Sequence, residues 1–293
     1  MQRTMPSAME AMTPTPTRWT CPACKTLVLT PFCAQCGESP LKPRDLTLRG
    51  LFGKLLHAVT SIDGKLLRTF WRLLRHPGTV TVDYLTGNRK PYIAPFQLFL
   101  VANVLFFAVQ SLTSTNIFGS PLDSHLHHQD WSALAQSLVD RHLQKHHTTL
   151  AEYAPVFDRA VVLNAKSLII LMVLPFGLLL ALVFIGRRKP FIAHVVFSLH
   201  LYTFLLLLFT VAVVAAAVNL WLGGAGLASA RVDNVLSVIN LTACAAYLGL
   251  ASARAYGDSG VMRWVRVALL ALAAGAIVLG YRFVIFLITL VAT

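Results

Sequence analysis

The chain has 293 residues, of which 56% are hydrophobic and only 13% carry a charged side chain. Soluble domains carry about 25% charged residues, so this composition excludes an ordinary soluble domain and predicts a membrane protein. Lys and Arg number 25 against 12 for Asp and Glu, and the net charge of +13 suits an anionic partner, either nucleic acid or a bilayer surface.

The first segment of the chain, residues 1–18, is rich in Pro, Thr and Met. It lacks the apolar core of a secretory signal peptide. We therefore expect a disordered lead-in without a targeting function.

Residues 19–40 contain two CxxC pairs within the stretch CPACKTLVLTPFCAQCG, separated by eight residues that can form a hairpin. Four thiolates can complete a tetrahedral shell around Zn²⁺ and leave no open position for catalysis. The ligands would be Cys21, Cys24, Cys33 and Cys36. Because so small a segment has too little core to fold without metal, we predict a structural zinc ribbon. A redox or disulfide role is the alternative, which a reducing cytoplasm disfavours.

Residues 46–76 have the pattern of two basic amphipathic helices that lie on a surface, the first over about residues 46–60 and the second from Lys65 to His76. In the second helix, at about 100° per residue, four bases fall within an arc of about 80° and Leu, Phe and Trp fill the other side. These bases are Lys65, Arg68, Arg72 and Arg75. Asp63 is expected to cap this helix, and Pro77 is expected to end it.

Two locations are possible for this second helix. We predict that it lies at the membrane interface with its bases near anionic headgroups. The alternative is a helix packed on the rest of the protein. Nucleic-acid binding is disfavoured, because the bases alternate with Leu rather than with exposed aromatic side chains and no reader motif accompanies them.

The segment 77–95 is predicted to be an elbow that turns the chain from the membrane surface into the first span. Two glycines permit backbone turns, two prolines interrupt helix, and two tyrosines suit the headgroup layer. These residues are Gly78, Gly87, Pro91, Pro95, Tyr84 and Tyr92.

Five apolar runs are long enough to cross a hydrocarbon core of about 30 Å as helices. They are Ile93–Leu112, Ser167–Gly186, Val195–Leu222, Val232–Ala253 and Trp264–Ala292. Helices of this length without a polar face belong in lipid. The predicted fold class is therefore an all-α polytopic membrane protein, with a transmembrane bundle in residues 96–293 behind the zinc ribbon and the interfacial helix.

The positions of Lys and Arg predict the orientation of the spans. Nineteen of them lie before the first span or in the turns after the second and fourth spans, against five in the loops on the other side. Since cytoplasmic loops retain positive charge, we predict a cytoplasmic N-terminus and an extracytoplasmic C-terminus.

Polar side chains within the spans are candidate functional sites. Asn103 and Gln110 lie seven residues apart on nearly one face of the first span, and His200 lies well inside the third. Arg282 is close enough to the end of the last span to extend toward the surface. A solute path lined by these residues competes with simple interhelical hydrogen bonding. Cys244 is expected to be a small buried apolar residue.

The predicted extracytoplasmic loop, residues 113–166, contains six histidines. If its middle is helical, His142 and His146 stand one turn apart on a common face, a spacing that can bind Zn²⁺, Cu²⁺ or Ni²⁺. A group of solvated histidines is the alternative, and no HExxH or Ser/His/Asp motif is present.

The double CxxC motif followed by LRTFWRLLRHPGTVTVDYLTGNRKPYIAP resembles a family of bacterial zinc-ribbon inner-membrane proteins grouped as a domain of unknown function. The matching positions are Leu67, Arg68, Thr69, Leu74, Pro77, Gly78, Tyr84, Gly87, Arg89, Tyr92 and Pro95. HVVFSLH (194–200) and YLGLASARAYG (247–257) are similar to that family's third and fourth spans. The resemblance implies this architecture in the bacterial inner membrane, and no activity.

Three functional hypotheses follow. The first is a non-enzymatic membrane protein whose zinc ribbon docks or senses an unidentified protein partner. The second is a transporter or channel lined by the polar side chains of the spans. The third is a membrane enzyme acting on a lipid-linked substrate, which the missing acid/base pair disfavours.

Overall fold

The computed structural model describes residues 18–40, 64–113 and 117–293. Most of the predicted lead-in, residues 1–17, lies outside the described residues. The upstream amphipathic helix predicted for residues 46–60 and the predicted cap Asp63 also lie outside them. Gly64 occupies the N-cap position of the downstream helix.

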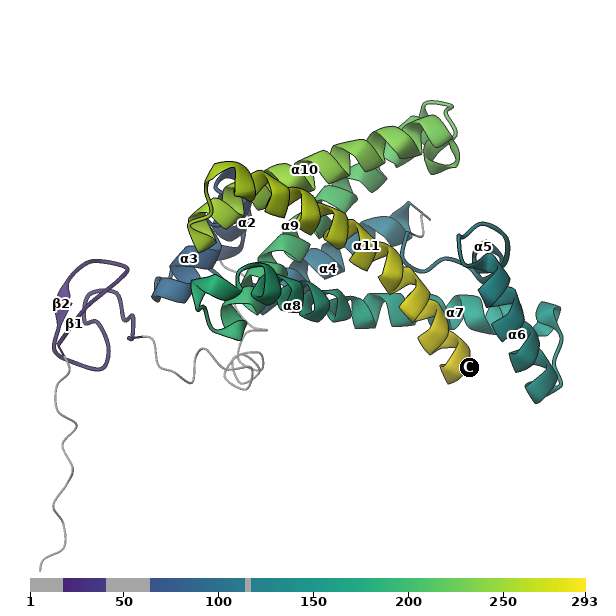
Figure 1. The fold of residues 1–293 in the computed structure, drawn as a ribbon, viewed down its shortest axis with the longest axis horizontal. Helices are drawn as coiled ribbons and strands as arrows, with labels where there is room; N and C mark the ends of the chain where they lie inside the picture. The colour runs from purple at the N-terminus through teal and green to yellow at the C-terminus, as the bar shows by residue number, and fades with distance from the viewer. Residues whose placement is uncertain (1–17, 41–63, 114–116) are drawn as a thin grey trace, which may run out of the picture.

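The N-terminal described segment is a small antiparallel hairpin. β1 (Trp19–Thr20) pairs with β2 (Leu27–Val28), so that Trp19 lies opposite Val28. In Figure 1 the two strands lie at one end of the molecule, close to α3 (Thr79–Thr86). The turn of this hairpin contains the first cysteine pair, so the hairpin does not lie between the two pairs as the sequence predicted.

Two short helices lead into the first long one. α2 (Lys65–Arg75) is followed by α3 and then by α4 (Pro95–Leu112). Gly78 and Gly87 flank α3 with positive φ values of 85° and 97°, which residues without a Cβ adopt with least strain. Pro95 takes the first position of α4, where its missing N–H costs nothing. The chain thus turns at both glycines, with the helix α3 between them.

Within the described residues, five helical segments are long and apolar enough to cross a membrane. They are Pro95–Leu112, Leu150–Val183, Phe191–Trp221, Arg231–Tyr256 and Gly260–Ala292. The chain is a multi-pass membrane protein with five candidate spans, and the all-α fold class is confirmed.

The second span begins earlier than the apolar run predicts. α7 (Leu150–Leu168), the 3₁₀ turn η2 (Ile169–Met172) and α8 (Val173–Val183) follow one another without a loop. Thr149 and Glu152 form a capping box that starts α7. Residues 150–166, assigned to the extracytoplasmic loop, are therefore helical. The apolar run stops at polar residues such as Lys166, but the helix continues through them.

The 3₁₀ turn η2 has a local cause. Pro175, in the first turn of α8, has no N–H to donate to the carbonyl of Leu171. A short 3₁₀ stretch at a helix end adjusts to such a missing bond.

The remaining helices complete the bundle. They are α5 (Leu122–His127), α6 (Ser132–His146), η3 (Ile185–Arg187), α9 (Phe191–Trp221), η4 (Gly226–Ala228), α10 (Ala230–Tyr256) and α11 (Gly260–Ala292). α5 and α6 lie at the end of the molecule opposite the β-hairpin (Figure 1). The two regions that carry candidate metal ligands are therefore far apart.

One large apolar cluster holds the helices together. α9 packs against α4, α8 and α10, and fully buried aromatic side chains fill the interior. They include Phe99, Phe106, Phe176, Tyr202 and Phe286. Because lipid tails are as apolar as these side chains, close packing rather than escape from water favours association within the membrane.

Polar contacts also fasten α11 to α7. The Tyr281 hydroxyl donates to the Ala165 carbonyl at 2.7 Å, and Asn164 Nδ2 donates to Thr289 Oγ1 at 2.9 Å. Interhelical hydrogen bonds of this kind stabilise helix pairs in bilayers by about 1 kcal/mol each. They fix the position of the last span.

Candidate metal centre and basic surfaces

The first CxxC pair lies in a tight backbone turn. The Cys21 N–H donates to the Thr26 carbonyl, and the Lys25 N–H donates to the Cys21 carbonyl, both at 2.9 Å. Lys25 has a φ of 61°, in the left-handed region that non-glycine residues seldom adopt. The turn therefore carries strain that the surrounding structure must offset.

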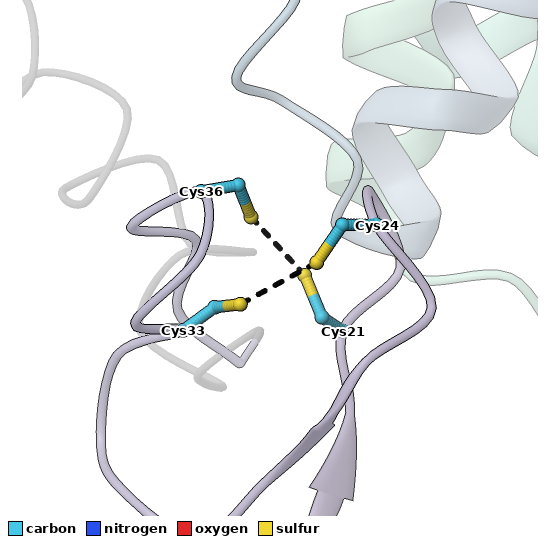
Figure 2. Close-up of side chains that lie close together, drawn as sticks. All are labelled: Cys21, Cys24, Cys33 and Cys36. Atoms are coloured by element: carbon cyan, nitrogen blue, oxygen red, sulfur yellow. Dashed lines mark hydrogen bonds between the residues drawn. The ribbon is translucent and has the colours of Figure 1, made fainter.

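The second CxxC pair repeats this turn. The Cys33 N–H donates to the Glu38 carbonyl at 2.7 Å, and the Gly37 N–H donates to the Cys33 carbonyl at 2.6 Å. Gly37 takes the left-handed position with a φ of 67°, where glycine is favoured. Each turn points its two cysteine side chains toward the other turn (Figure 2).

The two turns bring the four thiols together. The Sγ atoms of Cys21 and Cys36 are 3.4 Å apart, as are those of Cys24 and Cys33, and all four lie within 4.8 Å of one another. Zinc with sulfur ligands at about 2.3 Å gives a tetrahedron with edges of about 3.8 Å. A disulfide would need about 2.05 Å. The four cysteines are thus a possible metal site sized for one ion.

The local chemistry fits a metal. Hydrogen bonds with the side chain and backbone of Thr26 lower the pKa of the Cys24 thiol to about 6. A backbone hydrogen bond with Glu38 lowers the pKa of Cys36, but burial and the three neighbouring thiols together outweigh it and raise that pKa to about 12. The thiolate is the form of cysteine that binds metal. Across residues 18–40, 64–113 and 117–293, these cysteines are the one cluster of three or more potential ligands close enough to hold an ion.

The rest of the hairpin contributes little buried surface. Its buried cluster consists of Cys21, Val28 and Cys33. Three large apolar side chains instead face outward: Leu27 is 60% exposed, Leu29 53% and Phe32 63%. A segment with this core needs a cross-link to hold one conformation.

The helix α2 has three faces rather than the predicted two. Thr69 and Leu73 are buried, and Leu66 and Phe70 pack against the main core. The alternative of a helix packed on the protein therefore holds for this face. The apolar side was predicted as one continuous face because a helical wheel cannot say which part of it meets the protein.

The other two faces of α2 are exposed. Leu67, Trp71 and Leu74 are 76%, 63% and 47% exposed, and they lie between the packed face and the bases. Lys65, Arg68, Arg72 and Arg75 are all exposed, with the Arg75 guanidinium 5.6 Å from the centre of the Trp71 ring. An apolar strip beside a basic strip is typical of an interfacial helix. Binding to the membrane surface stays a prediction.

The hairpin contacts the elbow through Glu38, the last residue of the second turn. Its Oε2 accepts the backbone N–H of Lys90 at 3.1 Å, and its Oε1 accepts the N–H of Ser39 at 3.4 Å. Glu38 is buried. Glu38 is the only acidic residue between positions 19 and 40. Its position at the end of the second cysteine turn was the one feature of the sequence that could have indicated this contact.

The elbow is itself cross-linked. The Thr69 hydroxyl accepts the Ile93 N–H at 3.2 Å, and the Tyr92 hydroxyl donates to Asp83 Oδ2 at 2.9 Å. Burial, together with the neighbouring Asp83, raises the pKa of Tyr92. Tyr84, expected in the headgroup layer, is instead buried with the Arg89 guanidinium over its ring.

Two of the candidate polar residues in the spans lie on α4. Asn103 Nδ2 donates to the Lys166 carbonyl of α7 at 3.3 Å. Gln110 is buried and borders a space of about 10 Å³, too small for more than one water. These contacts are those of helix packing, and a solute path along this face stays a prediction.

The other two candidates lie on different helices. His200 Nδ1 is 2.8 Å from Thr81 Oγ1, so α9 is joined to α3 at a fully buried position. Arg282 Nη2 donates to Ser120 Oγ at 2.7 Å, which places it against the segment before α5. The partners of Asn103, His200 and Arg282 therefore lie on three separate segments, and Gln110 borders a space that α7 also lines.

The histidine pair on α6 is arranged as the sequence predicted. The rings of His142 and His146 stack with centroids 4.4 Å apart, and the Tyr153 ring lies 4.7 Å from that of His142. Partial burial, with the neighbouring His146 and Lys145, lowers the pKa of His142. Metal binding by this pair stays a prediction.

The comparisons with known proteins identify one segment. Residues 63–107 match the model of a family described as a protein of unknown function (DUF3667). The match includes α2, α3 and most of α4, which agrees with the resemblance seen in the sequence, whereas the cysteine cluster and the later spans lie outside it. No curated protein and no solved structure matches the chain.

Proposed function

We propose that this chain is an integral protein of the bacterial inner membrane whose zinc ribbon docks or senses a cytoplasmic protein. The observation that carries the proposal is the outward orientation of Leu27, Leu29 and Phe32 on a hairpin that the cysteine cluster can hold rigid. Exposed apolar groups on a small rigid element commonly mark interaction sites. Attachment to the five spans keeps this surface at a fixed place in the cell.

The zinc ion has a structural role in this proposal. Cys21, Cys24, Cys33 and Cys36 hold it, and the ion supplies a cross-link that fixes the hairpin. With four sulfur ligands there is no open position for water. The same site therefore argues against hydrolytic chemistry in the ribbon.

The basic surface supports the proposed orientation. Three arginines brace the turns at one end of the spans: Arg187 donates to the Gly257 carbonyl, Arg254 to the Pro77 carbonyl, and Arg266 to the Asp258 carboxylate. Together with the bases of α2 they lie on the side with the larger count of Lys and Arg. This side is the cytoplasmic one by the positive-inside rule.

A transporter or channel is the less supported alternative. Its proposed lining residues face three different segments: Asn103 and Gln110 face α7, His200 faces α3, and Arg282 faces the segment before α5. Among the described residues, Asp123 contacts His127 and His128, but all three side chains are exposed, so these contacts offer no enclosed site for a lipid-processing enzyme. Docking therefore remains the preferred function.

The docking proposal is tested with a photocrosslinking amino acid at position 32 of the full chain in native membranes. We expect crosslinks to a protein, and we expect them to disappear when Cys21 and Cys24 are both changed to Ser. The same crosslinker at Ala34, an exposed small residue of the second turn, serves as the matched control.

The outcomes separate the hypotheses. Protein crosslinks that persist without bound zinc would contradict a folded docking surface. Crosslinks only to lipid would show that the apolar side chains enter the bilayer instead. Membrane insertion is checked in every variant, because the five spans should be unaffected by changes in the ribbon.

Tethering by α2 is tested separately by hydrogen exchange of the full chain in nanodiscs. In discs with phosphatidylglycerol, residues 65–75 should exchange more slowly than in neutral discs, because each base near an anionic surface contributes on the order of 1 kcal/mol. Changing Arg72 and Arg75 to Gln should remove this difference. Equal exchange in both lipids would exclude an interfacial role.

A further inference from the structure

A pocket of about 410 Å³ lies where the ribbon meets the elbow. Its walls come from three separate segments: Glu38 from the ribbon, Lys65 from the start of α2, and Arg89 and Lys90 from the elbow. The zinc ribbon, the amphipathic helix and the entrance of the first span thus share one cavity.

The pocket carries an excess of positive charge. Three lining side chains, Lys65, Arg89 and Lys90, are cationic, and Glu38 is the single acidic one. The Glu38 carboxylate already accepts two backbone N–H groups, from Lys90 and Ser39. The net charge of the lining side chains is therefore positive, which favours the binding of an anion.

The surrounding structure positions the cations. The Arg89 guanidinium lies 5.4 Å from the centre of the buried Tyr84 ring, which restricts the plane of the guanidinium. Lys90 Nζ lies close to Gly37, because a Cβ atom built on Gly37 would be 2.5 Å from this Nζ. Long cationic side chains that are already placed lose less conformational entropy when a ligand binds.

The pocket also adjoins a helix N-terminus. Ala94, which lines it, is the N-cap of α4, and the 18-residue helix directs the positive end of its dipole toward that side. Anions are stabilised at such positions. Because α4 is the first candidate span, we expect this end at the boundary between membrane and water.

From these features we propose that the pocket binds a phosphate group, carried either by the headgroup of an anionic phospholipid or by a soluble phosphate compound. Arginine and lysine at a helix N-terminus supply the charge-assisted donors that phosphate oxygens accept. A bound phosphate would bridge the ribbon and the elbow. This inference holds whether or not the ribbon docks a protein.

The test uses the purified full chain and two probes. Native mass spectrometry of the detergent-solubilised protein measures the affinity for phosphatidylglycerol against phosphatidylcholine. Calorimetry of the protein in phosphatidylcholine nanodiscs measures the affinity for inorganic phosphate. Selective binding of phosphatidylglycerol alone identifies the lipid as the source, whereas binding of inorganic phosphate identifies a soluble ligand.

Arg89→Gln and Lys90→Gln are the test variants, and Arg75→Gln is the control, which removes an exposed arginine of α2 that does not line the pocket. We expect each test variant to weaken the binding that is observed by about tenfold or more, since a charge-assisted hydrogen bond is lost. The control should bind like the unmodified protein. Lys90→Gln keeps the test valid if Arg89→Gln disturbs the packing on Tyr84.

Two results would overturn the proposal. One is that neither phosphatidylglycerol nor inorganic phosphate binds the full chain selectively. The other is that Arg75→Gln weakens binding as much as the pocket variants, because the anion would then recognise the general basic surface. Zinc content is measured in each variant to show that the ribbon is intact.

Discussion

The ribbon and the helical bundle depend on different forces for their structure. Among the described residues, the ribbon buries a cluster of only Cys21, Val28 and Cys33, whereas the bundle buries aromatic and aliphatic side chains along the length of α9. We expect a hairpin with so small a core to depend on a metal ion held by its thiolates. The bundle depends on close packing and interhelical hydrogen bonds. Each part should therefore fail under treatments that leave the other intact.

The largest difference between the ribbon and the bundle is expected when the candidate metal ligands are removed. Changing Cys21 and Cys24 to Ser should abolish zinc binding and unfold the ribbon, because metal binding contributes about 10–16 kcal/mol in zinc-finger peptides. Protease should then cut within residues 19–40, while the thermal unfolding of the bundle stays unchanged. Cys244→Ser, in the fourth span, is the control that should retain zinc. Loss of the bundle together with the ribbon would show that the two parts are not independent.

Within the bundle, Gly78→Ala should be strongly destabilising. Gly78 has a φ of 85°, and a Cβ there would lie 2.8 Å from backbone atoms of Ala251 in α10. We expect destabilisation of roughly 3 kcal/mol, from left-handed strain and overpacking together. Unfolding in detergent measures it, and zinc content should not change.

Gly257→Ala is the matched control for Gly78→Ala. Gly257 also has a positive φ, 64°, but a Cβ there would meet nothing within 4 Å. Only the conformational cost of about 1 kcal/mol is expected. Equal effects of the two changes would show that contact with α10 does not matter.

The far end of the bundle should respond to acid. Burial of His125, with Arg282 nearby, lowers its pKa to about 4, and the Trp131 ring N–H donates to its Nδ1 at 3.2 Å. An unfolded histidine has a pKa of about 6.5. The stability that neutral His125 contributes is therefore present above pH about 6.5 and is lost as the pH falls toward 4, by up to about 3 kcal/mol.

His125→Gln should flatten this acid dependence, because glutamine retains an acceptor for Trp131 but does not titrate. His127→Gln, which changes an exposed histidine of the same helix, should leave the dependence in place. Thermal unfolding of the bundle between pH 7 and 4 provides the measurement. An unchanged slope in His125→Gln would show that another group is responsible.

The smallest expected effects concern the two turns of the ribbon. Gly37→Ala places a Cβ at a φ of 67° and close to Lys90 Nζ, so zinc retention should weaken by up to about tenfold. Lys25→Gly relieves the same left-handed strain in the first turn and should leave zinc retention equal or slightly stronger. Competition with a chelator measures both. A stronger loss in Lys25→Gly would contradict the equivalence of the turns.

The parts of the fold that could be predicted are those encoded by neighbouring residues. The five spans follow from long apolar runs, and the sulfur cluster follows from two short CxxC spacings. The start of α7 was missed because a capping box and polar side chains extend a helix beyond its apolar run. The role of Glu38 was also missed, because its partner Lys90 is 52 residues away in the sequence.

By itself the sequence determined the membrane class, the number of candidate spans and the four clustered thiols, since composition, helical periodicity and short spacing act locally. Only the tertiary structure decided which side of α2 packs, that His200 meets Thr81 across 119 residues, and that three distant segments enclose one basic pocket. Those contacts join elements far apart in the chain, and their pairing depends on how whole helices pack rather than on any local pattern.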